Sequence, residues 1–262
     1  NARYVKIQGI ASNATVYMIQ ELMAYEAVDK AALTAALDEA RTLLDEENKA
    51  MIFARAMQES PLATRKEVAA ALAQLQTAME EAQPQMTFTD VPEDSFYYNS
   101  VLWAVRNGIT AGTTPTTFAP NDPCMRAHVV TFLWRAAGTP EPTGTEHPFV
   151  DVKPTDFYYK PVLWALEKGI TAGMDATHFG PTVYCNRAQV VTFLHRTMGN
   201  PQPGTAENPF TDVKTGTFYE NPVLWAVANG ITAGLSATAF GPDTVCNRAQ
   251  IVTFLYRAFV KP

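Results

Sequence analysis

A sequence repeat with a period of 61 residues occurs three times without gaps from residue 88 onward, and it limits the possible folds more than any other feature. The motifs FTDV, FVDV and FTDV begin at Phe88, Phe149 and Phe210, and a VLWA motif follows each of them at constant spacing. Stretches rich in Pro, Gly and Thr separate the copies and are typical of linkers. One copy is too small to bury a core alone, so the sequence predicts units that pack against each other.

Each copy is predicted to contain two short helices joined by a loop. In the first copy, a helix over 99–107 ends at Gly108, which takes the left-handed conformation while Ile109 makes the accompanying apolar contact. A second helix begins near Arg126 and ends before Gly138. Its apolar residues should face an axis shared by the copies, so that a groove between neighbouring copies occurs three times. In the first copy these inward residues are Val129, Val130, Phe132 and Leu133.

The start of the second helix differs between the copies. Copies 2 and 3 have an N-cap asparagine followed three residues later by glutamine, which is a capping-box arrangement. These residues are Asn186 with Gln189 and Asn247 with Gln250. The first copy has Met125 and His128 there, so its cap is expected to be weaker by about 1 kcal/mol.

The residues before the repeats divide into a helical part and an extended part. Residues 29–82 are predicted to be helical, with a capping box formed by Thr64 and Glu67. Two apolar stripes at helical spacing indicate a small bundle. They are Leu33, Leu37, Ala40 and Leu44, and Val68, Leu72, Leu75 and Met79. Residues 1–26 are predicted to form two strands; the alternative is that 15–25 are helical and join the bundle.

Composition and charge exclude several classes of function. The chain is 47% hydrophobic with a net charge of −6, and no segment concentrates basic charge as nucleic-acid binding requires. No apolar run of the sequence is long enough to span a membrane. The chain begins at Asn1 without a secretory signal, and we expect it to be the C-terminal part of a longer protein.

The cysteines and histidines indicate neither a cofactor nor a metal. Cys124, Cys185 and Cys246 lie 61 residues apart, one in each copy. Three such residues cannot pair completely, and we expect them to act as small buried hydrophobic residues. Neither they nor the four histidines show the spacing of zinc ligands. We therefore expect no metal and no cofactor.

The repeated motifs resemble those of the S-layer homology family. The markers, over 88–260, are FxDV, an FY pair before an apolar helix, LWA followed by GI and G, F.P in the loop, and a TRAE-like start of the last helix. The resemblance implies a mainly helical, three-pronged pseudo-trimer of repeats. It also implies an extracellular protein, held at the bacterial cell wall by binding a secondary cell-wall polysaccharide that often carries pyruvylated, anionic sugars.

The motif residues of the family map onto four sets of positions, which the resemblance makes the candidate ligand-binding residues. They are Arg126, Arg187 and Arg248; Asp90, Asp151 and Asp212; Trp103, Trp164 and Trp225; and Gly112, Gly173 and Gly234. The sequence departs from the family beside each arginine. The Thr and Glu of TRAE become Met125 and His128, Asn186 and Gln189, and Asn247 and Gln250. The arginine is kept, but the first groove departs most from the family.

The chemistry of these residues suits an acidic sugar. An arginine at a helix N-terminus combines a bidentate donor with free backbone amides and the positive end of the helix dipole, which favours a carboxylate. An aromatic face suits the C–H side of a pyranose, and loop glycines let a ligand approach the backbone closely. Structural roles stay open as alternatives: the arginine could only bridge the FxDV aspartate, that aspartate could cap backbone amides, and the tryptophan could belong to the core.

Two further resemblances complete the division into domains. The segments 28–44 and 64–82 resemble the FIVAR module, a helical spacer, although 46–60 lacks the Tyr and Trp usual there. Residues 1–26 resemble the last strands of a discoidin-like carbohydrate-binding module. The predicted domains are therefore 1–26, 27–84, 88–148, 149–209 and 210–262.

The leading hypothesis is non-covalent anchoring of a secreted multimodular protein, without catalysis in this chain. The predicted partner is cell-wall polysaccharide, and neither nucleic acid nor a membrane. One alternative is a protein–protein scaffold or surface lattice, and another is the C-terminal part of a glycan-active enzyme whose catalytic domain lies upstream. Catalysis within the chain is disfavoured because a pair of adjacent carboxylates, Glu93 with Asp94, occurs in only one copy.

Overall fold

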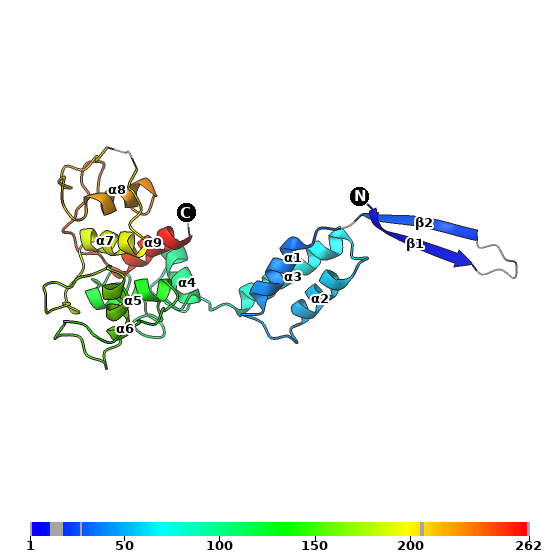
Figure 1. Cartoon of the computed structure of the whole chain (residues 1–262), viewed down its shortest axis with the longest axis horizontal. Helices are drawn as coiled ribbons and strands as arrows, with labels where there is room; N and C mark the ends of the chain where they lie inside the picture. Colours follow the sequence, from blue (N-terminus) through cyan, green and yellow to red (C-terminus); the bar gives the residue numbers. More distant parts are fainter. Residues whose placement is uncertain (1, 11–17, 27, 205–206, 261–262) are drawn as a thin grey trace. The chain divides into compact units, whose positions relative to one another are not determined.

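The computed structural model describes residues 2–10, 18–26, 28–204 and 207–260, and the chain divides into two compact units (Figure 1). Unit 1 is Asn1–Pro84 and unit 2 is Gln85–Pro262. The described part of the chain is mainly helical, with strands only in its first segment. The predicted fold class is therefore confirmed.

The N-terminal segment is a two-stranded antiparallel hairpin. Strand β1 (Ala2–Ile10) pairs with strand β2 (Met18–Glu26). The two predicted strands are confirmed, and the helical alternative for the second one is wrong over 18–25. Residues 15–17 lie outside the described part of the chain. The resemblance to a discoidin-like module stays a prediction.

Three helices follow and pack as a bundle around an apolar core (Figure 1). They are α1 (Ala31–Ala40), α2 (Lys49–Glu59) and α3 (Arg65–Ala82). α3 begins at the predicted capping box, in which Thr64 Oγ1 accepts from the Glu67 N–H at 3.3 Å and Glu67 Oε2 accepts from the Thr64 N–H at 2.8 Å. Both predicted stripes enter the core, although Leu44 and Leu72 are only partly buried. The FIVAR resemblance stays a prediction.

Each copy of the repeat in unit 2 supplies two helices. The first helices are α4 (Tyr98–Arg106), α6 (Tyr159–Glu167) and α8 (Glu220–Ala228). The second helices are α5 (Arg126–Ala136), α7 (Arg187–Thr197) and α9 (Arg248–Val260). In the first copy these bounds agree with the prediction to within one residue. The predicted inward side chains of α5 are all buried.

The glycine after each first helix ends that helix as predicted. Gly108 is left-handed, with φ of 64°. Its N–H donates to the Val105 carbonyl at 3.0 Å, and the Ile109 N–H donates to the Ala104 carbonyl at 2.7 Å. This pair of hydrogen bonds is the Schellman arrangement. Ile109 is fully buried, so the apolar contact that closes the cap is also confirmed.

The second helices begin as their N-cap residues predict. Asn186 Oδ1 accepts from the Gln189 N–H at 2.9 Å, while Gln189 Oε1 accepts from the Asn186 N–H at 3.3 Å. Asn247 and Gln250 form the same pair of bonds at the start of α9. Met125 provides no side-chain cap for α5. The first copy therefore lacks the side-chain cap of the other two, and the stability difference of about 1 kcal/mol stays a prediction.

The copies interlock around a pseudo-threefold axis, because each first helix packs on the second helix of another copy. α4 packs on α9, α6 on α5 and α8 on α7, and the helices α5, α7 and α9 contact one another. One continuous apolar core results, with residues from all three copies. Since α9 of the last copy packs on α4 of the first, the three copies form a closed ring.

The three cysteines lie where the copies meet. The Cys124 N–H donates to the Cys246 carbonyl at 3.1 Å, Cys185 donates to Cys124 at 3.0 Å, and Cys246 donates to Cys185 at 3.0 Å. These bonds form a closed ring of main-chain groups. Each thiol is free and fully buried, which confirms the predicted role as a small hydrophobic residue.

Ionisation of these thiols is expected to destabilise the fold at alkaline pH. Burial raises the pKa of each thiol to about 12, from about 9 for an exposed thiol. Between these values the unfolded chain releases the thiol protons while the folded chain keeps them. The contribution to stability is therefore complete below about pH 9 and is lost as the pH rises toward about 12. We expect each thiol to account for a loss of about 1.4 kcal/mol per pH unit in this window.

Urea unfolding followed at neutral pH, at about pH 9 and at about pH 10 measures this loss. The matched control carries Cys124→Ala, Cys185→Ala and Cys246→Ala together. Its stability should fall much less between the two alkaline values, because lysine and tyrosine titration is common to both chains. Equal slopes in the parent and the control would contradict the prediction.

Candidate functional site

The arginine that begins each second helix reaches from its own copy into another copy. Arg126 Nε donates to the Phe179 carbonyl at 2.9 Å, and its Nη2 donates to Thr171 Oγ1 at 3.3 Å. The equivalent bonds to carbonyls join Arg187 Nε to Phe240 at 3.0 Å and Arg248 Nε to Phe118 at 2.8 Å. The three predicted arginines therefore act first as links between the copies.

Each guanidinium is also buried between aromatic rings. Arg126 is 2% exposed, and its Cζ lies 4.9 Å from the centre of the Phe179 ring and 5.1 Å from that of Phe193. Burial lowers the pKa of Arg126, and the charge of Asp151 is among the influences that oppose this shift. The other two arginines also lie over two phenylalanine rings each. Only a small part of each guanidinium is thus available to a ligand.

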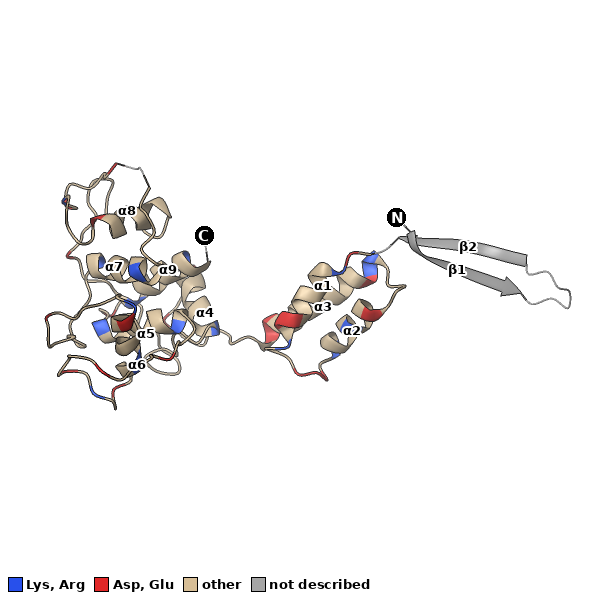
Figure 2. Ribbon diagram, in the orientation of Figure 1, with Lys and Arg blue, Asp and Glu red and all other residues tan. Residues whose placement is uncertain are grey.

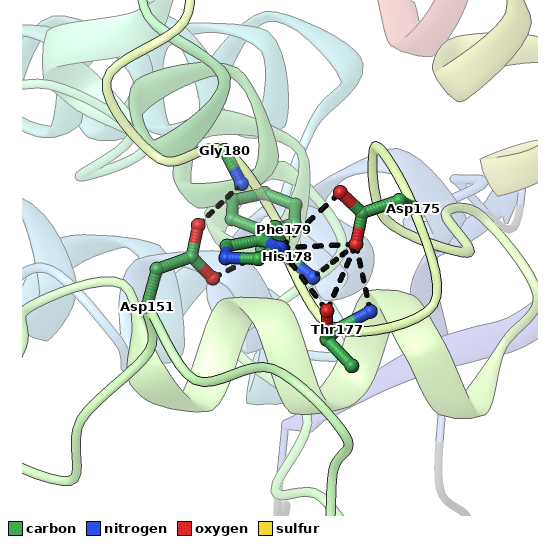
Figure 3. A network of polar contacts seen from close by, with 6 residues as sticks. All are labelled: Asp151, Asp175, Thr177, His178, Phe179 and Gly180. Carbon is green, nitrogen blue, oxygen red and sulfur yellow. Dashed lines mark hydrogen bonds and ion pairs between the residues drawn. The ribbon is translucent and has the colours of Figure 1, made fainter.

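The FxDV aspartate holds the same peptide from its other side (Figure 3). Asp151 accepts from the N–H groups of Phe179 and Gly180 at 2.8 Å each. Arg126 donates to the carbonyl of the same Phe179–Gly180 peptide. The aspartates with the same role in the other copies are Asp90 and Asp212. The alternative that these aspartates cap backbone amides is confirmed. The arginine and the aspartate bind the same peptide group, the arginine at its carbonyl and the aspartate at its N–H.

The expectation that the helix N-termini offer free amides is wrong. The Arg126 N–H donates to the Val183 carbonyl at 2.8 Å, and the Ala127 N–H donates to the Pro181 carbonyl at 3.1 Å. Loop carbonyls accept from the first amides of α7 and α9 in the same way. A ligand carboxylate at these positions must therefore be met by side chains.

An open groove lies beside one of these arginines. Groove 1 has a volume of about 580 Å³ and lies between the loop 110–113, helix α5 and Arg248. Phe157 of the second copy forms part of its wall, and Arg135, near the end of α5, also lines it. Groove 1 thus combines residues from all three copies.

The equivalent groove recurs one copy further along the chain. Groove 2 has a volume of about 310 Å³ and lies between the loop 171–174, helix α7 and Arg126. Arg196 near the end of α7 and Phe218 of the third copy complete it. By the 61-residue period, the corresponding residues at the third position are Arg187, Arg257 and Phe96.

Sequence reasoning missed two sets of residues that line these grooves. The first is the arginine near the end of each second helix: Arg135 and Arg196 donate through Nη1 to main-chain carbonyls at 3.0 and 2.9 Å, and both remain partly exposed. The second is an exposed phenylalanine from the following copy, with Phe157 60% and Phe218 61% exposed. Their recurrence every 61 residues was the available signal, because an exposed aromatic that is repeated in each copy calls for an explanation.

Two of the three candidate glycines line the grooves, and the backbone requires glycine at all three positions. Gly173 in groove 2 has φ of 90°, and a Cβ atom there would lie 2.5 Å from Phe149 Cε1. Gly112 lines groove 1 with φ of 83°, and Gly234 has the same conformation in the third copy. Only glycine therefore fits these positions without a shift of the loop.

The loop beyond Gly173 is fixed by a local network (Figure 3). Asp175 Oδ1 accepts from the N–H groups of Thr177 and His178 at 2.8 and 2.9 Å. The Thr177 amide and then the His178 side chain are the main causes that lower the pKa of Asp175 to about 2. The carboxylate therefore stays ionised at any physiological pH and holds the loop beside groove 2 in one conformation.

The candidate tryptophans belong to the core. Trp164 and Trp225 are 4% and 6% exposed. Trp103 is partly buried, and its ring centre lies 5.7 Å from that of Tyr256 and 6.3 Å from that of Phe259. Of the two alternatives, the structure supports packing in the core over a place on the groove wall.

Groove 1 differs chemically from groove 2, in line with the departure in the first copy. His128 replaces the capping glutamine, and its ring stacks on Phe157 at 5.6 Å with an interplanar angle of 21°. Burial and the nearby Arg248 lower the pKa of His128, so the ring is neutral at neutral pH. Asp122 also lines groove 1, and the equivalent position in copy 2 is the uncharged Val183. Groove 1 thus has the larger volume, and its lining includes an acidic residue, which groove 2 lacks.

The three second helices set the charge around the grooves. α5, α7 and α9 each carry two arginines and no acidic residue (Figure 2). Two cations beside a partly enclosed groove favour an anionic ligand, because low-dielectric walls weaken the screening by water.

The described residues hold neither a candidate membrane span nor a candidate metal site. Within the described ranges, no helix has the length and hydropathy needed to cross a membrane. Among the same residues, no three His, Cys, Asp or Glu side chains come together as metal ligands would, and the three cysteines are no exception.

A comparison with protein families gives one match that coincides with the three copies. The model described as S-layer homology domain matches residues 87–130, 148–191 and 209–252, which is just over half of the chain. Each match contains the FxDV segment, the first helix, the loop and the first turns of the second helix.

Three curated relatives illustrate where similar sequences occur. An "Endoglucanase" of Bacillus sp. (strain KSM-635) is 30% identical over 47% of this chain and 13% of its own length. An "S-layer protein" of Bacillus thuringiensis subsp. finitimus is 23% identical over 64% of the chain and 21% of its own length. A "Surface-layer 125 kDa protein" of Lysinibacillus sphaericus is 31% identical over 46% of the chain and 10% of its own length. The chain thus spans about a tenth to a fifth of these relatives.

Proposed function

The chain belongs to the S-layer homology domain family, whose repeats anchor surface proteins to the bacterial cell wall, and we propose that its ligand there is an anionic secondary cell-wall polysaccharide with pyruvylated sugars. The location is the bacterial cell surface. The matched repeats are anchoring modules and not catalytic domains.

The observation that carries this proposal is the pairing of arginines with an exposed phenylalanine in each groove. In groove 2, the partly exposed Arg196 donates through Nη1 to the Ile170 carbonyl at 2.9 Å, and its guanidinium has further N–H groups to offer a carboxylate. Arg126, which also lines groove 2, adds a second positive charge. Phe218 offers an apolar face to the C–H side of a pyranose. Groove 1 also has two arginines and an exposed phenylalanine, but the His128 ring stacks on one face of Phe157.

The parts before the repeats fit a role as spacer and display. We propose that the bundle α1–α3 acts as a FIVAR-like spacer and that the hairpin is the end of a discoidin-like module. S-layer proteins and a protein named endoglucanase are among the relatives. A glycan-active domain in the parent protein is therefore one candidate cargo for this anchor.

Loss of the exposed aromatics is expected to weaken wall binding while leaving the fold intact. A variant with Phe96→Ala, Phe157→Ala and Phe218→Ala removes three side chains that are 60–68% exposed, so its stability should change little. We expect its apparent affinity for purified Gram-positive wall sacculi to fall at least about tenfold, because several grooves bind the polymer together. Co-sedimentation with sacculi measures the effect.

The matched control is Val150→Ala, which removes an apolar side chain that is 68% exposed in the second copy. It should bind sacculi like the parent. Sacculi stripped of their polysaccharide by acid should retain neither protein. Undiminished retention on stripped sacculi would contradict the proposal and favour protein–protein contacts instead.

A further inference from the structure

A second cavity adjoins groove 2 at the junction between copies 2 and 3. This junction pocket has a volume of about 260 Å³ and lies between the end of α7, the linker 200–203 and the start of α8. Arg196 and Phe218 line both groove 2 and the junction pocket. The two cavities therefore share a wall formed by these side chains.

The equivalent junction between copies 1 and 2 is built differently at its rim. There Lys160 Nζ and Glu141 Oε1 form an ion pair at 2.7 Å, which ties the linker to the first helix of the next copy. The 61-residue period places Asn221 and Gln202 at these positions in the next junction. Exposed amide groups thus stand where the other junction has a closed ion pair.

The side chain at the base of the pocket also differs between the two junctions. Trp134 at the first junction donates through Nε1 to the Pro140 carbonyl at 2.8 Å. His195 takes its place at the second junction and binds the Pro201 carbonyl through Nε2, also at 2.8 Å. A carbonyl only accepts, so His195 Nε2 carries the proton. The smaller imidazole ring thus keeps the hydrogen bond to the linker that the indole ring makes at the first junction.

We propose that the junction pocket is a subsite for an uncharged sugar, N-acetylhexosamine or hexose, next to the acidic sugar in groove 2. This inference rests on the proposed function of the grooves. The pocket offers the amides of Asn200, Gln202 and Asn221, which both donate and accept hydrogen bonds, and no acidic residue lines it. Proline rings of the linker supply apolar surface. This chemistry suits hydroxyl and acetamido groups more than a second carboxylate.

The test uses the full chain with Phe96→Ala and Phe157→Ala, so that groove 2 is the groove that keeps its phenylalanine. Two probes are compared by calorimetry: a 4,6-O-pyruvylated N-acetylhexosamine methyl glycoside, and the disaccharide that adds one uncharged N-acetylhexosamine to it. We expect the disaccharide to bind about tenfold more tightly, which corresponds to two or so additional net hydrogen bonds.

A closing variant rebuilds the first junction in the second. It combines His195→Trp, Gln202→Glu and Asn221→Lys, and its net charge equals that of the parent. We expect it to bind the monosaccharide unchanged and to lose the tenfold preference for the disaccharide. Should the tryptophan disturb folding, the exposed pair Gln202→Glu with Asn221→Lys alone should still reduce the preference.

Three outcomes would overturn the subsite. In two of them groove 2 binds the monosaccharide, but the disaccharide binds no tighter, or the closing variant that folds keeps the preference. Either result leaves the proposed function standing and removes the subsite alone. If the parent chain binds neither probe, the proposed ligand of the grooves is wrong, and the subsite falls with it.

Discussion

Replacing Arg187 by alanine is expected to lower the free energy of unfolding by about 4 kcal/mol, although the residue is a candidate ligand contact. The side chain is 3% exposed and donates to the Phe240 carbonyl and to Thr232 Oγ1 at 3.0 Å each. Its removal leaves a buried carbonyl without this donor and leaves a space over the rings of Phe240 and Phe254. Urea unfolding followed by tryptophan fluorescence measures the change.

This fluorescence reports on unit 2, since all four tryptophans lie in the repeats. The matched control is Lys160→Ala, which breaks an ion pair whose side chains are 55% and 70% exposed. Exposed pairs contribute little, so the control should lose less than about 1 kcal/mol. Equal losses in the two variants would contradict the role of Arg187 as a buried link. If the expected loss of stability is found, a loss of wall binding in an arginine variant is evidence of ligand contact only when the variant is shown to be folded.

Replacing Gly173 by alanine is expected to cost about 3 kcal/mol of stability and to distort groove 2. The new Cβ would lie 2.5 Å from Phe149 Cε1 and 2.7 Å from the carbonyl oxygens of Asp175 and His178. The φ of 90° adds strain for any residue with a side chain. Main-chain oxygens cannot move without disturbing the loop, so the cost is not relieved by a rotamer change.

Gly169→Ala is the control for this substitution. Gly169 also has a positive φ, of 67°, but a Cβ there would meet nothing within 4 Å. It should therefore lose only the conformational strain of about 1 kcal/mol. The same urea unfolding separates the two variants. If both lost the same amount, close contact around Gly173 would not be the cause.

Local structure was predictable from the sequence because it depends on neighbours in the chain. Gly108 with Ile109 is sufficient to predict a Schellman cap, and Asn186 with Gln189 is sufficient to predict a capping box. The 61-residue period, in turn, makes each of these predictions apply to the other copies.

Contacts between copies were not predictable in the same way. The period shows that Arg126 has equivalents, but it does not say which copy its side chain enters. The structure places it on Phe179, 53 residues away, while Arg248 reaches Phe118 across 130 residues. For the same reason, the sequence did not show that loop carbonyls accept hydrogen bonds from the first amides of the second helices. Nor did it show that phenylalanines line the grooves, since Phe157 completes a groove built mainly by other copies.

The ring of cysteine amides determines how many copies such a module can have. Each of the three main-chain donors finds its acceptor on another copy, and each first helix is covered by another copy. Deleting one copy would leave a main-chain donor, a main-chain acceptor and an apolar helix face without their partners. A fourth copy would have no free donor or acceptor in the ring to bind. A gene encoding this anchor can therefore gain or lose wall affinity by whole triplets, or by exchanging a copy with a second chain.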